Sequence, residues 1–138
     1  MTCLPEHYPP FFYLSLAESY PEAFLVAEVD TKVVGYIMCR VEMGFSSFGV
    51  LQGFARKGHI VSIAVRPEFR SIGVGMALVE ETMKALKEYY NCAECYLEVR
   101  VSNQAAVALY EKLKFKKVRR LHSYYRDGEG AFLMSIRL

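Results

Sequence analysis

Residues 70–75, Arg-Ser-Ile-Gly-Val-Gly, constrain this chain more than any other stretch of its sequence. They follow an apolar run at 60–65, which predicts a strand, and precede a helical pattern over residues 74–90. A strand, a glycine turn and a helix N-terminus often bind phosphate, because the unpaired N–H groups of the first helical turn point at the anion. The two glycines allow a ligand close to the backbone, and the arginine adds positive charge. A short glycine motif alone has many false positives, so an ordinary strand-to-helix connection is the alternative.

Two other phosphate-binding motifs are absent from the sequence. It has no G-x-x-x-x-G-K-S/T loop, and the turn lacks the third glycine of the dinucleotide-binding fingerprint. The composition is that of a globular protein, with 53% hydrophobic and 23% charged residues. We therefore expect one domain over residues 1–138, which is long enough to bury a single core.

The charge and hydropathy of the sequence argue against nucleic acid and membranes as partners. The net charge of +2 is too small to suggest nucleic acid as a partner. Neither a membrane span nor a signal peptide is visible, so we expect no membrane partner and a cytoplasmic protein. Cys92 and Cys95 have C-x-x-C spacing, but no second pair or nearby histidine completes a zinc site. We therefore expect that the protein binds no metal and that its cysteines are structural or incidental.

The order of the remaining elements predicts an α/β fold with a mixed sheet. A helix is expected over 11–19, a strand hairpin over 24–29 and 33–41, and a glycine-rich apolar loop over 44–58. After the central strand (59–66) and the helix (74–90) come strand 95–101, helix 103–113 and strands 115–122 and 131–138. Strand, helix and strand in the middle of the chain predict a parallel βαβ crossover, flanked by antiparallel hairpins.

A second motif lies in the predicted helix 103–113. Asn103 is followed by Ala106, Tyr110 and Phe115 in the pattern N-x-x-A-x-x-x-Y, with a phenylalanine just past the helix. Taken alone, Tyr110 would be a core aromatic on an amphipathic helix. Together with the complete R-x-x-G-x-G turn, the segment resembles the GNAT superfamily of acetyl-CoA-dependent N-acetyltransferases. Lys114 departs from many of these proteins, which have glycine just past the helix.

The resemblance implies the acyl-CoA N-acyltransferase fold, with acetyl-CoA (coenzyme A) bound at the turn. Tyr110 would be the general acid near the thioester sulfur, and the backbone N–H of Val65 would face the oxyanion. The implied cofactor-binding residues are Ile63, Ala64, Val65, Arg70, Ser71, Ile72, Gly73, Val74, Gly75, Met76, Ala77, Asn103, Ala106 and Tyr110.

His59 and Glu98 are the candidates for the catalytic base. A histidine titrates near neutral pH, and a partly buried glutamate can be raised toward it. Either group could take the proton of the amine directly or through water. A histidine at the surface end of a strand, or a glutamate facing solvent, remains the alternative for each.

Further segments make the resemblance more specific. Residues 4–8, 34–38, 59–65, 97–103 and 124–129 together look like the archaeal N-terminal (Nα) acetyltransferases, which are related to the NatA catalytic subunit and the bacterial ribosomal-protein alanine acetyltransferase. The implied acceptor is the α-amino group of a protein or peptide N-terminus. The implied substrate-binding residues are Glu6, Tyr36, Arg100, Tyr124 and Tyr125. A GNAT enzyme acting on lysine side chains or a small amine, and a coenzyme A-binding regulatory module, are the alternatives.

The start of the chain departs from the family. Only three residues precede the Leu4-Pro5-Glu6 segment, where GNAT domains have a first strand and helix, so these elements are expected to be missing or shortened. An exposed edge strand invites pairing with another chain. The expected state is a monomer or a weak homodimer.

Overall fold

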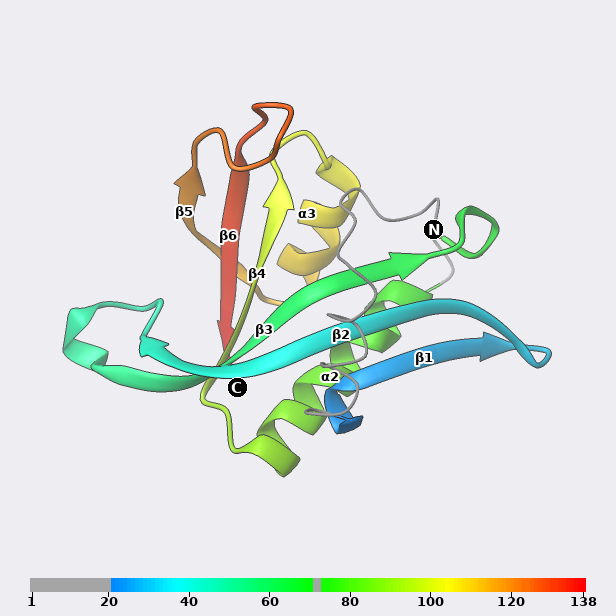
Figure 1. The fold of residues 1–138 in the computed structure, drawn as a ribbon, viewed down its shortest axis with the longest axis horizontal. Coiled ribbons are helices and arrows are strands. Elements are labelled where there is room, and N and C mark those ends of the chain that lie inside the picture. The colour runs from blue at the N-terminus through cyan, green and yellow to red at the C-terminus, as the bar shows by residue number, and fades with distance from the viewer. Residues whose placement is uncertain (1–20, 71–72) are drawn as a thin grey trace.

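The computed structural model describes residues 21–70 and 73–138 (Figure 1). The helix expected over 11–19 lies outside the described residues. The strands are β1 (Phe24–Val29), β2 (Lys32–Phe45), β3 (Phe54–Val65), β4 (Glu94–Arg100), β5 (Lys116–Leu121) and β6 (Ala131–Arg137). The helices are α2 (Val74–Tyr90) and α3 (Gln104–Lys112), with 3-10 turns η1 (Pro21–Ala23), η2 (Val50–Gln52) and η3 (Pro67–Phe69).

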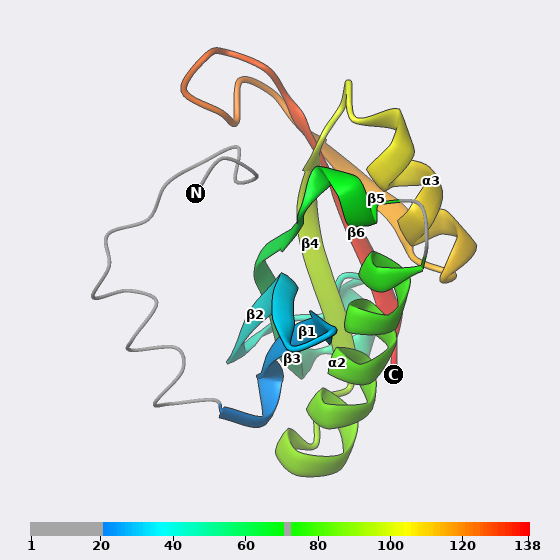
Figure 2. The ribbon, with the colours of Figure 1, turned by 90° about the vertical axis from the view of Figure 1, so that its right-hand side faces the viewer.

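The six strands form one mixed sheet in the order β1-β2-β3-β4-β6-β5. The β3–β4 pair is parallel and is joined through α2, whereas the remaining neighbours are antiparallel. Figure 2 shows α2 and α3 on the same side of the sheet. The predicted mixed α/β architecture, with a parallel crossover between antiparallel hairpins, is confirmed.

The core lies between the sheet and the two helices. Val79 and Leu86 on α2 are fully buried, as the spacing of apolar residues predicts for one helical face. On β4, Leu97 and Val99 are buried while Glu98 between them is only half-buried. This alternation sends the apolar side chains of β4 into the core and leaves the intervening polar ones on the opposite face.

The prediction of a glycine-rich loop over residues 44–58 is wrong for most of this segment. β2 continues to Phe45 and β3 begins at Phe54, so only residues 46–53 connect them. The two phenylalanine rings stack with centroids 4.4 Å apart, and this cross-strand pair supports the extended hairpin. Glycine in this segment serves packing: a Cβ on Gly58 would lie 2.4 Å from a methyl carbon of Leu86. Gly58 thus allows β3 to approach α2 closely, and the prediction wrongly took this glycine as the sign of a loop.

The three cysteines in the described part of the chain behave as core residues. Cys39, Cys92 and Cys95 are buried free thiols. Burial is the main reason why the pKa of each thiol lies above its ordinary value, which disfavours the reactive thiolate. Within the described ranges, no group of histidine, cysteine, aspartate and glutamate could hold a metal ion, and no helix is long and apolar enough to span a membrane.

Replacing Lys114 with glycine is expected to stabilise the fold. Lys114 follows α3 with φ = 80°, a left-handed conformation in which the Cβ atom is unfavourable. We expect the free energy of unfolding to rise by about 0.5–1 kcal/mol, because the relief of strain exceeds the entropy cost of glycine. Urea denaturation measures this change. Lys112→Gly, at the last residue of α3, is the matched control and should instead destabilise the fold, by up to about 1 kcal/mol.

Candidate active site

The strands β3 and β4 part in the middle of the sheet and open a groove. Their parallel pairing covers only residues 57–59 of β3 and 94–96 of β4, and beyond this point the strands diverge (Figure 1). The groove has a cavity volume of about 890 Å³ and extends to the turn before α2 and to α3. It is large enough for a ligand of cofactor size.

Arg70, Gly73 and Gly75 of the glycine motif line this groove. Gly73 is the N-cap of α2, with φ = 92°, and the position of its missing Cβ opens into free space. A ligand can therefore approach the first turn of α2 closely, as an anion at a helix N-terminus requires. The Nε of Arg70 donates to the carbonyl oxygen of Val65 at 2.9 Å. This bond ties the turn to the end of β3.

Beyond its short ladder with β4, the edge of β3 that faces the groove carries backbone donors with no partner among the described residues. The N–H of Arg66 donates to the carbonyl oxygen of Val34 on β2 at 2.7 Å. Hydrogen-bonding direction alternates along an antiparallel strand, so the N–H of Val65, which lies opposite Gly35, points away from β2. The ladder with β4 does not extend this far. The N–H of Val65 is thus directed toward the groove.

Helix α3 places Asn103 and Tyr110 on the groove. The Oδ1 of Asn103 accepts a hydrogen bond from the N–H of Ala106 at 3.1 Å, which caps the helix. Tyr110 is 5% exposed, and its ring packs edge-on against Phe115. Burial raises the pKa of Tyr110, with a smaller contribution from the Cys95 thiol. Its hydroxyl therefore stays protonated at neutral pH and can donate a proton.

His59 and Glu98 meet where β3 and β4 separate. The Nε2 of His59 lies 2.7 Å from the Oε1 of Glu98. His59 also stacks flat on Tyr96, its register partner, with ring centroids 4.3 Å apart. Tyr96 donates in turn to Glu42, so the histidine plane is held from one side. Glu98 lines the groove, with His59 behind it.

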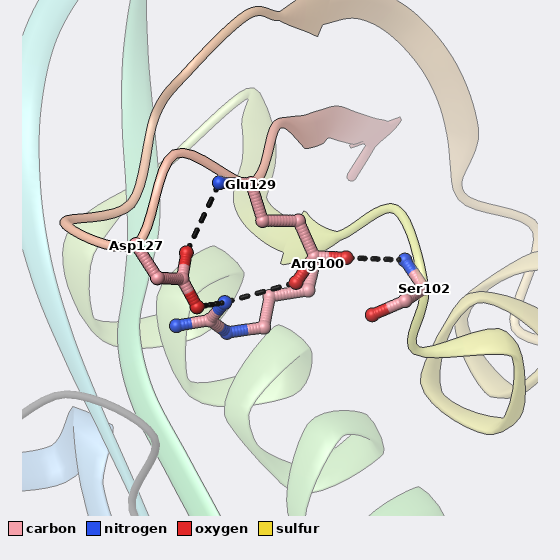
Figure 3. Close-up of polar contacts among 4 residues, drawn as sticks. All are labelled: Arg100, Ser102, Asp127 and Glu129. Carbon is pink, nitrogen blue, oxygen red and sulfur yellow. Dashed lines mark hydrogen bonds and ion pairs between the residues drawn. The ribbon is translucent and has the colours of Figure 1, made fainter.

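Arg100 connects the end of β4 to the loop between β5 and β6 (Figure 3). Its Nη1 lies 2.8 Å from the Oδ2 of Asp127 and 2.9 Å from the Oε1 of Glu129. The other oxygen of Glu129 accepts the N–H of Ser102 at 3.0 Å. The guanidinium also stacks on the ring of Tyr125, 4.0 Å from its centroid. We call Arg100, Asp127 and Glu129 the loop clamp, because they hold the loop that carries Tyr124 and Tyr125 beside the groove.

The structure brings most of the predicted site residues to one groove. Its lining includes Ile63, Ala64, Val65, Arg70, Gly73, Gly75, Met76, Glu98, Arg100, Asn103, Ala106, Tyr110, Tyr124 and Tyr125. Tyr36 does not line the groove itself, but its hydroxyl lies 3.3 Å from that of Ser62, which does. Val74 and Ala77 line a separate hollow between α2 and β1. Glu6, Ser71 and Ile72 lie outside the described residues. The roles assigned to these residues stay predictions.

The comparisons with known proteins agree with this geometry. Residues 1–115 match the family model described as the acetyltransferase (GNAT) family. The chain belongs to the GNAT acetyltransferase family. GNAT enzymes use acetyl-CoA.

Several individual proteins are similar to this chain. It is 54% identical over 132 residues to the N-alpha-acetyltransferase of Sulfurisphaera tokodaii, and the match covers 96% of this chain and 79% of the relative. The NatC complex bound to Gag peptide and CoA is a structural neighbour, with a TM-score of 0.84 and 26% identity over 98% of this chain and 83% of that one. Naa20 of Chaetomium thermophilum in complex with a bisubstrate analogue has a TM-score of 0.82 and 28% identity, covering 96% and 75%.

Sequence reasoning did not identify the supporting contacts of this GNAT site. The stack of Tyr96 on His59 and the two carboxylates of the loop clamp were assigned no role. Both depend on register across the sheet: His59 pairs with Tyr96, and Arg100 pairs with Ala131, two residues after Glu129. The polarity alternation of β4 was the available signal, because it places Tyr96, Glu98 and Arg100 on one face.

Proposed function

We propose that this protein transfers the acetyl group of acetyl-CoA to the α-amino group of protein N-termini. One observation carries the proposal: a single groove joins glycines at a helix N-terminus, a protonated buried tyrosine and a glutamate paired with a histidine. Aminolysis of a thioester needs a base for the ammonium, a donor for the carbonyl oxygen and an acid for the departing sulfur. The relatives named N-alpha-acetyltransferase support the choice of acceptor.

Each chemical requirement has a residue in the groove. Bound acetyl-CoA supplies the activated acetyl group, and the turn at Gly73 and Arg70 would hold its phosphates. Glu98 accepts a proton from the incoming amine and passes it to His59 over their 2.7 Å contact. The Val65 N–H is the donor for the carbonyl oxygen, and the hydroxyl of Tyr110 protonates the sulfur. Tyr124 and Tyr125, which line the groove, and Tyr36 beside Ser62 would contact the peptide that carries the reacting amine.

The test follows thiol release from acetyl-CoA with short peptides that differ only in residue one. Each peptide is offered with a free and with a blocked N-terminus. Turnover confined to the free peptides is the expected result. Turnover on blocked peptides that contain lysine would move the assignment to side-chain acetylation. Binding of acetyl-CoA without transfer to any peptide would indicate a regulatory module.

Breaking the loop clamp is expected to weaken peptide binding selectively. Glu129→Gln removes the charge that pairs with Arg100 and accepts the Ser102 N–H, so Tyr124 and Tyr125 lose their fixed position. We expect the KM for the peptide to rise roughly 10-fold, and the KM for acetyl-CoA to stay within about twofold. Glu111→Gln, an exposed charge on α3, is the matched control and should leave both KM values unchanged.

Low pH should break the ion pairs of the loop clamp, because its two carboxylates become protonated. The N–H of Glu129 and the Arg100 guanidinium hold the pKa of the Asp127 carboxyl below its ordinary value. Bonds from Ser102 and Arg100 lower the pKa of Glu129 in the same way. Because both pKa values are depressed, the clamp is complete above the ordinary carboxyl range and is lost as pH falls below it. A KM for the peptide that stayed constant through this range would contradict the clamp's role.

A further inference from the structure

Positive charge is concentrated on one edge of the molecule. Seven of the 17 lysines and arginines lie between residues 112 and 126, where no aspartate or glutamate occurs. Subtracting these seven leaves ten cations against all 15 carboxylates in the rest of the chain. The net charge of +2, from which we expected no nucleic-acid partner, therefore averages a strongly basic segment with an acidic remainder. We call this segment the basic ridge; its cations are Lys112, Lys114, Lys116, Lys117, Arg119, Arg120 and Arg126.

The basic ridge is built on β5, the last strand at its end of the sheet (Figure 1). All seven cationic residues are exposed. None of them has a carboxylate partner in the described part of the chain, unlike Arg40 and Arg100. Unpaired cations held on a rigid strand form a positive field that attracts polyanions.

The strand presents its charges on both faces. Residues Lys116 to Arg120 rise about 3.3 Å each, so cations on one face repeat at about 6.6 Å. A bulge between Lys117 and Arg119 interrupts the register with β6. The ammonium of Lys117 lies over the ring of Phe132, 4.4 Å from its centroid, which places this side chain on the helix-bearing face. The charges thus surround the edge and do not form a single flat patch.

The composition of the ridge favours a nucleic-acid backbone over a protein partner. Protein interfaces have an apolar and aromatic centre, whereas nucleic-acid interfaces are polar, wet and strongly positive. Val118, at 38% exposure, is the one large exposed hydrophobic residue on β5. Lysines also protect edge strands against aggregation. That role does not account for Lys112, Lys114 and Arg126, which lie outside the strand.

We propose that the basic ridge binds the phosphate backbone of double-helical RNA without reading its sequence. Such RNA is recognised mostly through its shape, its phosphates and its 2′-hydroxyls. The ridge adjoins the groove, since Lys112 lines the groove and Arg126 follows Tyr125 in the loop. Binding there would hold the enzyme on an RNA surface while the groove stays open. The inference goes beyond the proposed function and does not depend on it.

The test measures fluorescence anisotropy of a labelled RNA duplex of about 20 base pairs over a range of KCl concentrations. The ridge variant carries Lys116→Gln, Lys117→Gln, Arg119→Gln and Arg120→Gln. The matched control removes the same charge elsewhere, through Lys32→Gln, Arg56→Gln, Lys84→Gln and Lys87→Gln. We expect the ridge variant to lose at least about 10-fold in affinity and to reduce the slope of log K against log salt by about 3–4. The control should bind nearly as the unchanged protein does.

Three outcomes would overturn the inference. They are a failure of the unchanged protein to bind the duplex at 50 mM KCl, equal losses in the ridge and control variants, and displacement of the RNA by polyglutamate at equal charge concentration. The last result would show that the basic ridge binds an acidic polypeptide as well as it binds RNA. Thermal unfolding and peptide acetylation serve as controls for folding, and both should be unchanged in the ridge variant. If that variant unfolds, the single changes Lys116→Gln and Arg119→Gln provide the same comparison, each with a slope change of about 1.

Discussion

Replacing Tyr110 with phenylalanine is expected to lower kcat roughly 10²–10⁴-fold, the usual contribution of a general acid or base. The ring keeps its packing against Phe115, so only the proton donor is lost. Acetyl-CoA affinity should stay within about twofold, because the change affects the reaction more than the binding of the ground state. Steady-state kinetics and calorimetric titration with acetyl-CoA measure the two effects separately.

Tyr90→Phe is the matched control for this experiment. Its hydroxyl bonds to Glu22 at the far end of α2, outside the residues that line the groove. We expect this variant to turn over as the unchanged protein does. Equal activity of Tyr110→Phe and the unchanged protein would show that another group protonates the sulfur.

Introducing aspartate at Gly73 is expected to abolish acetyl-CoA binding. The side chain would project into the open space at the N-terminus of α2, where the phosphates are proposed to lie. Like charges brought together cost several kcal/mol, which corresponds to a loss in affinity of roughly 100-fold or more. Calorimetry with acetyl-CoA measures the loss directly.

Gly53→Asp separates this effect from backbone strain. Gly53 also has a positive φ, 70°, and open space at its Cβ position, but it lies at the tip of the β2–β3 hairpin. Both substitutions therefore add a charge and a strained left-handed residue. Retained affinity in Gly53→Asp together with lost affinity in Gly73→Asp is the expected pair of results. Equal losses would assign the effect to folding.

Helices and the central crossover were predictable because their signals are local. The predicted helix 74–90 coincides with α2, since apolar residues such as Val79 and Leu86 repeat at helical spacing along it. Strand β4 was predicted within one residue at each end by its alternating pattern. The hairpin over 44–58 was not predicted, because Gly44 and Gly58 indicate loops in sequence but here belong to β2 and β3.

Many of the residues that line the groove could be named from the sequence, but their contacts could not. His59 and Glu98 were candidates by residue type, but their 2.7 Å contact depends on the parallel register that places His59 beside Tyr96. Arg100 was expected to bind substrate, and the structure places it against Asp127 and Glu129. Such pairs join residues far apart in sequence, so no local pattern specifies them. Direct contact of Arg100 with a substrate stays a prediction.

The most direct test of acetyl transfer to N-termini is a competition within one molecule. A short peptide with a free α-amino group and an internal lysine is incubated with the enzyme and acetyl-CoA, and fragmentation mass spectrometry locates the acetyl group. We expect the acetyl group on the N-terminal nitrogen alone. Acetylation of the lysine with the N-terminus left free would contradict the proposed function.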